Sequence, residues 1–278
     1  MIQDIEPMKL DNSYNADITA DNDSVVFIFD EREIAYRGDC ADTFPVFGEI
    51  GGASELIYLF SIDGRKYFLC TDTTELSIPE KFSCTDVKNL RRCVNIPRHE
   101  VFASATAYHL YKWYASNRFC GECGGTLIHT TAERALLCPH CGELIYPRIN
   151  PAVIAGVTDG DRILVTRYAG SRGVNYDALV AGFVEIGETP EQTVAREVME
   201  ETGLKVKNIR YYKSQPWGYS AGLLMGFYCE ADSSDKIVLD ESELQSAVWV
   251  KREDIKGQPD NFSLTHEMMM KFKSGEIR

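Results

Sequence analysis

Hydrophobic positions in the first hundred residues fall into short runs that turn residues separate. Residues 25–30 (VVFIFD) are almost wholly apolar, and residues 57–62 and 65–70 flank Asp63-Gly64, a pair typical of tight hairpins. The aromatic-rich segment 100–119 has the pattern of a helix instead. We therefore expect a strand at 25–30, a hairpin at 57–70 and a helix at 100–119.

A second series of hydrophobic runs begins after Pro151. Residues 152–157 (AVIAGV) and 162–168 (RILVTRY) flank the turn TDGD and predict another hairpin. The strongest helical pattern in the chain covers residues 190–202. Further strands are expected at 209–214, 223–231, 236–240 and 246–252, and a closing amphipathic helix near 265–273.

These elements divide the chain into three zones. We expect an N-terminal mixed α+β domain at residues 1–115, a cysteine-bearing module at 116–147 and a C-terminal α/β domain at 148–278. The 278 residues suit about two ordinary domains, or one large domain with a small insert. With 44% hydrophobic and 26% charged residues, the composition is that of a globular protein with a real core.

Charge and hydropathy narrow the classes of function. The formal net charge of −13 argues against a broad nucleic-acid surface, which rests on Lys and Arg neutralising phosphates. It still permits a small anionic substrate, because a bound divalent metal reverses the local sign of charge. No apolar stretch reaches the roughly 20 residues that a membrane span needs, and the first residues lack a secretory pattern. We expect a cytoplasmic protein with no membrane partner.

Four of the nine cysteines form two CxxC pairs, Cys120–Cys123 and Cys138–Cys141, separated by fourteen residues. Two thiolates on one tight turn can share an ion, and two such turns complete a tetrahedral zinc site of four cysteines. A redox CxxC pair is the alternative, but two copies at this spacing favour zinc. Because all four ligands come from the protein, we expect a structural zinc, with His129 and His140 as bystanders.

The glycines and the remaining cysteines complete this picture. We expect the glycines of the module to supply unusual backbone angles in its turns; they are Gly121, Gly124, Gly125 and Gly142. The other cysteines stand alone and are expected to behave as small buried hydrophobic residues. They are Cys40, Cys70, Cys84, Cys93 and Cys229.

The segment from Gly182 to Leu204 combines a glycine-bearing entry, a helix and a dense set of carboxylates. Thr189 suits the N-cap, Pro190 suits the first helical position, and Gly203 suits the C-terminal stop. On a 3.6-residue helix, Glu197, Glu200 and Glu201 share one stripe, where they would repel one another without a cation. Mg²⁺ prefers such oxygen ligands. A solvated acidic face is the alternative, but it does not explain the glycines and arginine together.

Four other side chains of this helix have expected supporting roles. Arg196 lies four residues before Glu200 and can brace it. The apolar positions on the other side of the helix are expected to pack on a sheet; they are Val194, Ala195 and Val198.

This segment resembles the box of the Nudix superfamily, GX5EX7REUXEEXGU, at every defining position. The resemblance implies a C-terminal Nudix α/β/α sandwich with a mixed sheet, and metal-dependent hydrolysis of a nucleoside diphosphate derivative by water. It implies Glu197 and Glu201 as ligands of Mg²⁺ or Mn²⁺, with Glu200 as a further ligand or the general base. The backbone carbonyl of Ala181 is an additional expected ligand. Arg196 belongs to the same catalytic set.

Features outside the box resemble the NADH pyrophosphatase family. Ser214-Gln215-Pro216-Trp217 resembles the opening of that family's SQPWPFPxS motif, although Gly218-Tyr219-Ser220-Ala221-Gly222 replaces its second half. The family also has a four-cysteine ribbon before the Nudix domain, a Tyr-Pro pair after it and an LAGFVE-like entry to the box. The resemblance covers residues from about 91 to the end.

The resemblance also indicates residues that contact the substrate. A dinucleotide needs aromatic faces for its bases, and the candidates are Trp217, Tyr219, Phe183 and Tyr146. The whole expected substrate-binding set is Gln215, Pro216, Trp217, Gly218, Tyr219, Ser220, Ala221, Gly222, Phe183, Tyr146, Glu133 and Arg91. Glu243 matches a downstream family glutamate that binds metal, with an ordinary surface glutamate as the alternative.

The leading hypothesis is hydrolysis of NADH or NAD⁺ to nicotinamide mononucleotide and AMP, together with removal of NAD caps from RNA. No strand–GxGxxG–helix fingerprint is present, so NAD(H) is expected as a substrate and not a redox cofactor. One alternative is a Nudix hydrolase for ADP-ribose or another nucleoside diphosphate derivative. Another is a zinc-ribbon binding module without catalysis. A homodimer is expected from the resemblance alone.

Overall fold

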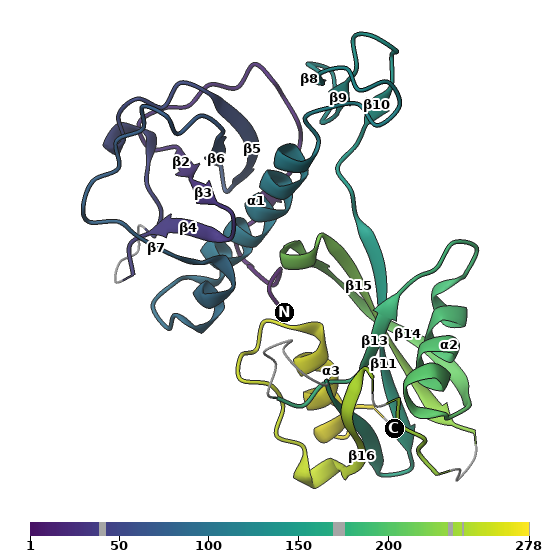
Figure 1. The fold of residues 1–278 in the computed structure, drawn as a ribbon. Coiled ribbons are helices and arrows are strands. Elements are labelled where there is room, and N and C mark those ends of the chain that lie inside the picture. The colour runs from purple at the N-terminus through teal and green to yellow at the C-terminus, as the bar shows by residue number, and fades with distance from the viewer. Residues whose placement is uncertain (39–42, 169–175, 233–235, 241, 278) are drawn as a thin grey trace. The chain divides into compact units, whose positions relative to one another are not determined.

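The computed structural model describes residues 1–38, 43–168, 176–232, 236–240 and 242–277. The chain divides into two compact units (Figure 1). The N-terminal unit contains residues 2–148 and 218–221, and the C-terminal unit contains residues 149–217 and 222–278 with Met1. The cysteine module thus belongs to the N-terminal unit, and each unit is described by itself below.

Two small sheets form the body of the N-terminal unit. The first has the order β1-β5-β6-β2 and the second the order β3-β4-β7. Their strands are β1 (Leu10–Asp11), β2 (Val25–Phe27), β3 (Phe29–Asp30), β4 (Glu33–Tyr36), β5 (Leu56–Ile62), β6 (Arg65–Cys70) and β7 (Ser83–Asp86). The expected hairpin is confirmed, because β5 and β6 pair antiparallel around Asp63 and Gly64. Both turn residues have positive φ, 47° and 80°, as a tight hairpin requires.

The expected strand at 25–30 is split between the two sheets, because Ile28 separates β2 from β3. The expected aromatic helix is confirmed as α1 (Arg98–Ser116), which ends three residues earlier than the pattern indicated. Its aromatic side chains face the strands, and the rings of Tyr111 and Phe29 stack with centroids 4.9 Å apart. Short 3-10 turns cover Phe47–Glu49 and Val87–Arg92.

The cysteine module is a three-stranded sheet of order β10-β9-β8 at the far end of α1 (Figure 1). Its strands are β8 (Ile128–His129), β9 (Leu136–Leu137) and β10 (Leu144–Ile145). Tyr14 donates a 2.9 Å hydrogen bond to the Thr130 carbonyl, and Arg134 donates a 3.0 Å bond to Asn12 and another to the Leu59 carbonyl. These bonds explain why the module packs with the N-terminal strands.

The C-terminal unit is built on one six-stranded mixed sheet. The order is β14-β15-β11-β12-β16, with β13 on β11, and only the β11–β15 pair is parallel. The strands are β11 (Asn150–Asp159), β12 (Arg162–Tyr168), β13 (Val180–Phe183), β14 (Val206–Trp217), β15 (Gly222–Ala231) and β16 (Leu244–Lys251). The helices are α2 (Pro190–Thr202) and α3 (Leu264–Lys273), with a 3-10 turn at Arg252–Asp254, whereas the 3-10 turn Gly218–Ser220 belongs to the N-terminal unit.

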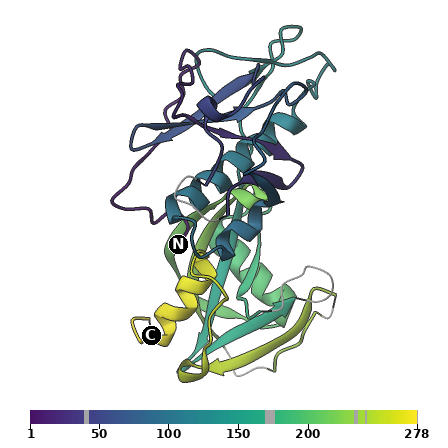
Figure 2. The same ribbon diagram turned by 90° about the vertical axis from the view of Figure 1, so that its left-hand side faces the viewer.

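Side chains along β11 point alternately to the two faces of the sheet, so they belong to two separate hydrophobic cores. Val153, Ala155 and Val157 pack with Val194 and Val198 of α2, and Ile154 packs with the buried residues of α3. The two helices therefore cover opposite faces of the sheet, and Figure 2 turns the α3 side toward the reader. The expected α/β/α sandwich with a mixed sheet is confirmed.

Three expectations about packing are wrong. Ala195 is exposed, because it is turned about 100° from Val194 on the helix. Among the isolated cysteines, Cys70 and Cys229 are buried, but Cys84 is exposed and Cys93 is half-buried. Cys40 lies outside the described residues.

None of the described helices is long and apolar enough to cross a membrane.

The expected strand at 236–240 is not a strand in the structure. The Val238 amide donates to the Thr202 carbonyl at 2.9 Å, and the Asp240 amide donates to the Glu201 carbonyl at 3.2 Å. The last carbonyls of a helix lack intrahelical donors, and this segment supplies them. Ile237 packs on the core under α2, so its apolar pattern reflects packing at a helix end.

Candidate functional site

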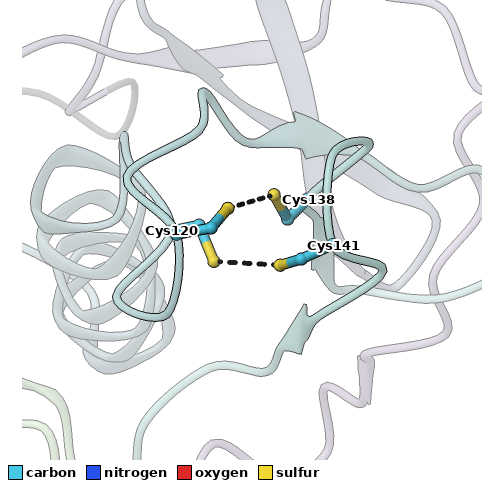
Figure 3. Close-up of side chains that lie close together, drawn as sticks. Cys120, Cys138 and Cys141 are labelled. Atoms are coloured by element: carbon cyan, nitrogen blue, oxygen red, sulfur yellow. Dashed lines mark hydrogen bonds between the residues drawn. The ribbon is translucent and has the colours of Figure 1, made fainter.

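The four cysteines of the CxxC pairs converge at one point of the module. Their sulfur atoms all lie within 4.8 Å of one another. Cys120 Sγ lies 3.6 Å from Cys141 Sγ, and Cys123 Sγ lies 3.4 Å from Cys138 Sγ. Figure 3 shows Cys138 and Cys141 facing Cys120 from the opposite loop. Within the described residues, this is the only such group of three or more His, Cys, Asp or Glu ligands.

The two cysteine turns are held by matching backbone hydrogen bonds. Gly124 N donates to the Cys120 carbonyl and Gly142 N donates to the Cys138 carbonyl, both at 2.9 Å. Gly124 and Gly142 have positive φ values of 74° and 83°, which confirms their expected role. Gly121 and Gly125 do not have positive φ, so that expectation is wrong for them. A Cβ on Gly125 would lie 3.3 Å from Cys138 Sγ, so close packing is the constraint there.

The donor chemistry of this cluster fits zinc. Amide hydrogen bonds from Cys141 and His140 lower the pKa of Cys138 to about 6, whereas the pKa values of Cys123 and Cys141 are raised in the crowded cluster, and a bound cation would favour the thiolate at all of them. The His129 ring packs against the Tyr114 ring at a tilt, with centroids 5.0 Å apart, and burial lowers the pKa of His129. Neither histidine belongs to the cluster, so four protein thiolates close the site and make it structural.

The carboxylate site lies where β13 leads into α2. Thr189 Oγ1 accepts from Gln192 N at 3.3 Å, while Gln192 Oε1 accepts from Thr189 N at 2.8 Å. This reciprocal capping box, with Pro190 at the first helical position, fixes the start of α2 at the expected residue. Gly203 ends the helix with φ 70°. The expected helix at 190–202 is confirmed with both boundaries.

Arg196 is the centre of the carboxylate site. Its Nε and Nη2 donate to the two oxygens of Glu188 at 2.7 and 2.9 Å. Its Nη1 donates to Glu197 and Glu200, both at 2.9 Å, and Nη2 also donates to the Phe183 carbonyl at 3.1 Å. The planar guanidinium can contact all these groups together, which a lysine ammonium cannot do. Its expected bracing of Glu200 is thus confirmed and extends to three carboxylates.

The charges around Arg196 separate the roles of the glutamates. Hydrogen bonds from Arg196 lower the pKa of Glu188 to about 2, and Thr193 Oγ1 adds a 2.9 Å bond. Glu188 therefore anchors Arg196 as a permanent anion. Burial raises the pKa of Glu197, Arg196 opposes that rise, and the negative charges of Glu200 and Glu243 add to it. A cation beside Glu197 would stabilise its ionised form, and so would oppose both the effect of burial and the repulsion from Glu200 and Glu243.

Of the other expected metal ligands, Ala181 lies on β13, Glu200 and Glu201 lie in the last turn of α2, and Glu243 directly precedes β16. Glu201 is buried, with 2% of its surface exposed, whereas the Glu200 side chain is 58% exposed. Ala181 lies on β13 opposite Ile154, one residue before Gly182. A Cβ on Gly182 would overlap the Glu197 carboxylate, so the missing side chain makes room for that carboxylate. The carboxylate oxygens of the box glutamates and the carbonyl oxygen of Ala181 are ligands that suit a hard divalent cation such as Mg²⁺ or Mn²⁺.

The SQPW segment contributes differently from the expectation. Gln215 is fully buried, and its side chain donates to the Phe262 carbonyl at 2.8 Å and accepts from Leu264 N at 2.7 Å. It therefore joins β14 to the start of α3, and its role as a substrate contact stays a prediction. Gly218 packs on the Ala105 carbonyl of α1, and Tyr219 is 7% exposed. Their expected contacts with the substrate stay predictions as well.

Other expected contact residues remain accessible. Phe183 and Tyr146 are 55% and 53% exposed, as a base-binding ring requires. Tyr146 donates a 3.1 Å hydrogen bond to Glu133, which joins these two within the module. The Arg91 guanidinium lies 5.2 Å from the Tyr219 ring centre. Trp217 is half-buried, Pro216 and Ser220 are exposed, Ala221 is half-buried and Gly222 is buried.

Comparison with known families agrees with this geometry. Residues 148–271 match the NUDIX domain, and residues 115–146 match the NADH pyrophosphatase zinc ribbon domain. The C-terminal region of the chain is therefore a Nudix domain. Its box is the Nudix box, and the cysteine module of the chain is a zinc ribbon.

Known proteins are similar to part of this chain. Proteins named NAD-capped RNA hydrolase NudC from Enterobacter sp. (strain 638) and Escherichia fergusonii are each 41% identical, over 170 and 171 residues. The matches cover 61% of this chain and 65% of the length of either relative. A solved NUDIX hydrolase from Nitrosomonas europaea has a TM-score of 0.49 and 23% identity, over 56% of this chain and 90% of that chain.

Some residues of the Nudix site were not recognised from the sequence. Thr193 supports Glu188 by its hydroxyl, and a polar residue five positions after Glu188 on the first turn of α2 was the available signal. The 236–240 segment, tied to the end of α2, had no local signal because its partner lies more than thirty residues away.

Proposed function

We propose that this protein is a metal-dependent hydrolase that cleaves the pyrophosphate of NADH or NAD⁺, giving nicotinamide mononucleotide and AMP. The observation that carries the proposal is the group of Nudix carboxylates around Arg196, in a domain that directly follows an NADH pyrophosphatase zinc ribbon. Removal of NAD caps from RNA is part of the same proposal. It is supported by the relatives named NAD-capped RNA hydrolase NudC, whose length is matched to 65%.

The box carboxylates are the proposed holders of Mg²⁺ or Mn²⁺. Glu197, Glu200 and Glu201 would hold the ion, with the Ala181 carbonyl and Glu243 as further oxygen donors. When bound, such a cation lowers the pKa of water and neutralises charge that develops on phosphate.

The residues of the chain have separate proposed tasks. Arg196 fixes the orientation of Glu197 and Glu200, and Glu188 fixes Arg196. Glu200 is the most exposed of the box carboxylates on α2. It can therefore serve as the general base for the attacking water or as a further ligand of the ion. Exposed Phe183 and Tyr146 offer flat faces to the bases of a dinucleotide.

The test compares substrates on the zinc-loaded full-length protein. NADH, NAD⁺, ADP-ribose and an NAD-capped RNA are incubated with Mg²⁺ or Mn²⁺, and the products are separated by chromatography. We expect metal-dependent release of AMP from NAD(H), and a loss of roughly 10²-fold or more in Glu200→Gln or Glu201→Gln. Equal or faster cleavage of ADP-ribose contradicts the substrate assignment. No turnover of any diphosphate favours a binding module.

We also propose that the protein is a cytoplasmic homodimer. The support is the family resemblance alone, and light scattering on the purified chain measures the mass directly. A monomer at micromolar concentration contradicts the dimer, and fractionation of the source cell tests the compartment.

A further inference from the structure

The end of α2 is joined to a distant segment at the position of a box glutamate. Asp240 N donates to the Glu201 carbonyl at 3.2 Å, two residues after Val238 N donates to the Thr202 carbonyl. The Glu201 side chain itself is buried beside this contact. The backbone of Asp240 is therefore fixed relative to the carboxylate stripe of α2.

Asp240 also organises the residues that follow it. Its Oδ1 accepts from Ser242 N at 2.9 Å and from Ser242 Oγ at 2.6 Å. Its carbonyl accepts from Glu243 N at 3.2 Å and from Leu244 N at 2.9 Å. These bonds lower the freedom of the backbone that carries Glu243, and the Ser242 bonds lower the pKa of Asp240, so the carboxylate accepts as an anion.

Glu243 is consequently held from both sides. Leu244, directly after it, is 1% exposed and begins β16, so it is anchored in the sheet. Asp240, before it, is anchored to α2. Glu243 N donates to the Asp240 carbonyl and Asp240 N donates to the Glu201 carbonyl, both at 3.2 Å, so two hydrogen bonds tie the backbone of Glu243 to the end of α2.

We propose that Asp240 is a positioning residue that holds Glu243 against the carboxylates of α2 and thereby sets the affinity of the box for its divalent metal. The inference rests on the proposed function, since it takes Glu243 as an oxygen donor to that metal. Groups that orient a metal ligand typically change metal affinity by about 10- to 100-fold when removed. Asp240 acts through Glu243 and not on the substrate.

The test measures Mn²⁺ alone on the zinc-loaded full-length protein, from the loss of the free-Mn²⁺ EPR signal. We expect Asp240→Ala to weaken Mn²⁺ binding about tenfold. Asp240→Asn keeps an oxygen acceptor at the same atom, so it should stay within about threefold of wild type. In assays, the Mn²⁺ concentration for half-maximal rate should rise in Asp240→Ala, with kcat at saturating Mn²⁺ little changed.

A double-mutant cycle separates positioning from general stability. Because Asp240 acts through Glu243, the double variant Asp240→Ala/Glu243→Gln should bind Mn²⁺ as Glu243→Gln alone does. Additive losses, or an Asp240→Ala protein with wild-type affinity, overturn the proposal. If Asp240→Ala does not fold, Ser242→Ala removes only the hydroxyl bond, and unchanged Mn²⁺ affinity there also overturns it.

The same data keep the two proposals apart. A wild-type protein that binds Mn²⁺ without cleaving NAD(H) contradicts the proposed function, while the titration still decides the role of Asp240. A wild-type protein with no measurable Mn²⁺ binding overturns both.

Discussion

The zinc ribbon and the Nudix box both gather metal-binding side chains, but they hold them by different means. In the ribbon, each cysteine pair is fixed by backbone hydrogen bonds within its own six-residue turn. In the box, Glu188, Glu197 and Glu200 are fixed by one guanidinium, that of Arg196. The four thiols converge within 4.8 Å, and the described box carboxylates do not form such a group.

This difference in how the ligands are held matches the different tasks of a structural and a catalytic metal site. A structural ion needs a closed set of ligands, which short local turns can preform. A catalytic ion keeps positions for water and substrate, so its carboxylates must be spread and still be oriented. Arg196 does this with directional hydrogen bonds that reach β13 and α2 together. Variants in each region should therefore change either zinc content or catalysis, and seldom both.

The largest expected effect comes from breaking the ribbon. Cys120→Ser replaces a buried thiolate ligand by a poor one, and structural zinc supplies on the order of 10 kcal/mol of apparent binding energy to folding. We expect zinc measured by mass spectrometry to fall and the ribbon to unfold well below the wild-type melting temperature. Cys84→Ser, an exposed cysteine of the same unit, is the control and should change neither. Wild-type zinc content in Cys120→Ser would refute the site.

The second-largest expected effect comes from replacing Arg196, which contacts three carboxylates of the box. Arg196→Lys keeps the charge but loses the fork that contacts Glu188, Glu197 and Glu200 together. We expect kcat to fall about 10²-fold, equal to about 2.7 kcal/mol of transition-state stabilisation, with zinc content unchanged. Arg162→Lys, at a surface ion pair in the β11–β12 turn, is the control. A kcat near the wild-type value in Arg196→Lys would show that catalysis does not depend on the contacts of Arg196 with the three carboxylates.

A smaller effect compares one glycine from each region. The Cβ of Gly182→Ala overlaps the Glu197 carboxylate, a flexible group that must leave its rotamer at a cost of about 0.5–1.5 kcal/mol. We expect up to about a tenfold fall in kcat/KM. In Gly125→Ala the new Cβ lies 3.3 Å from Cys138 Sγ and 3.4 Å from Cys123 Sγ, a tight contact with two zinc ligands, so zinc content should fall slightly while the activity of the zinc-loaded fraction stays near wild type. Wild-type zinc content in Gly125→Ala would show that the cysteine turns can shift enough to accept a methyl group.

The same contrast between local and distant interactions explains what the sequence could predict. The bounds of α2 follow from Thr189, Pro190 and Gly203, which act within one turn of each helix end. The cysteine cluster follows from spacing, and the β5–β6 hairpin from Asp63-Gly64. In each case the residues that decide the structure are neighbours in the chain.

The sequence did not indicate contacts between residues that lie far apart in the chain. Residues 236–240 have a strand-like pattern, but their amides bind the carbonyls at the end of α2. Gln215 is part of a substrate motif by resemblance, yet its side chain binds the start of α3, 47 and 49 positions away. Tyr219 is an aromatic candidate whose burial depends on α1. Periodicity does not indicate such partners, because it reports only that one face is covered.

The smallest expected effect tests whether the box depends on its helix cap. Thr189→Ala removes the hydroxyl that accepts from Gln192 N, which typically costs about 1 kcal/mol. Ser263→Ala removes the equivalent cap of α3, where Ser263 Oγ accepts from His266 N at 3.0 Å, and should cost a similar amount. We expect melting temperatures to fall by about 4 °C in both. Because Arg196 and Thr193 still hold Glu188, kcat should stay within about twofold in both variants. A much larger loss of kcat in Thr189→Ala than in Ser263→Ala would mean that the cap, and not Arg196 alone, orients the catalytic carboxylates.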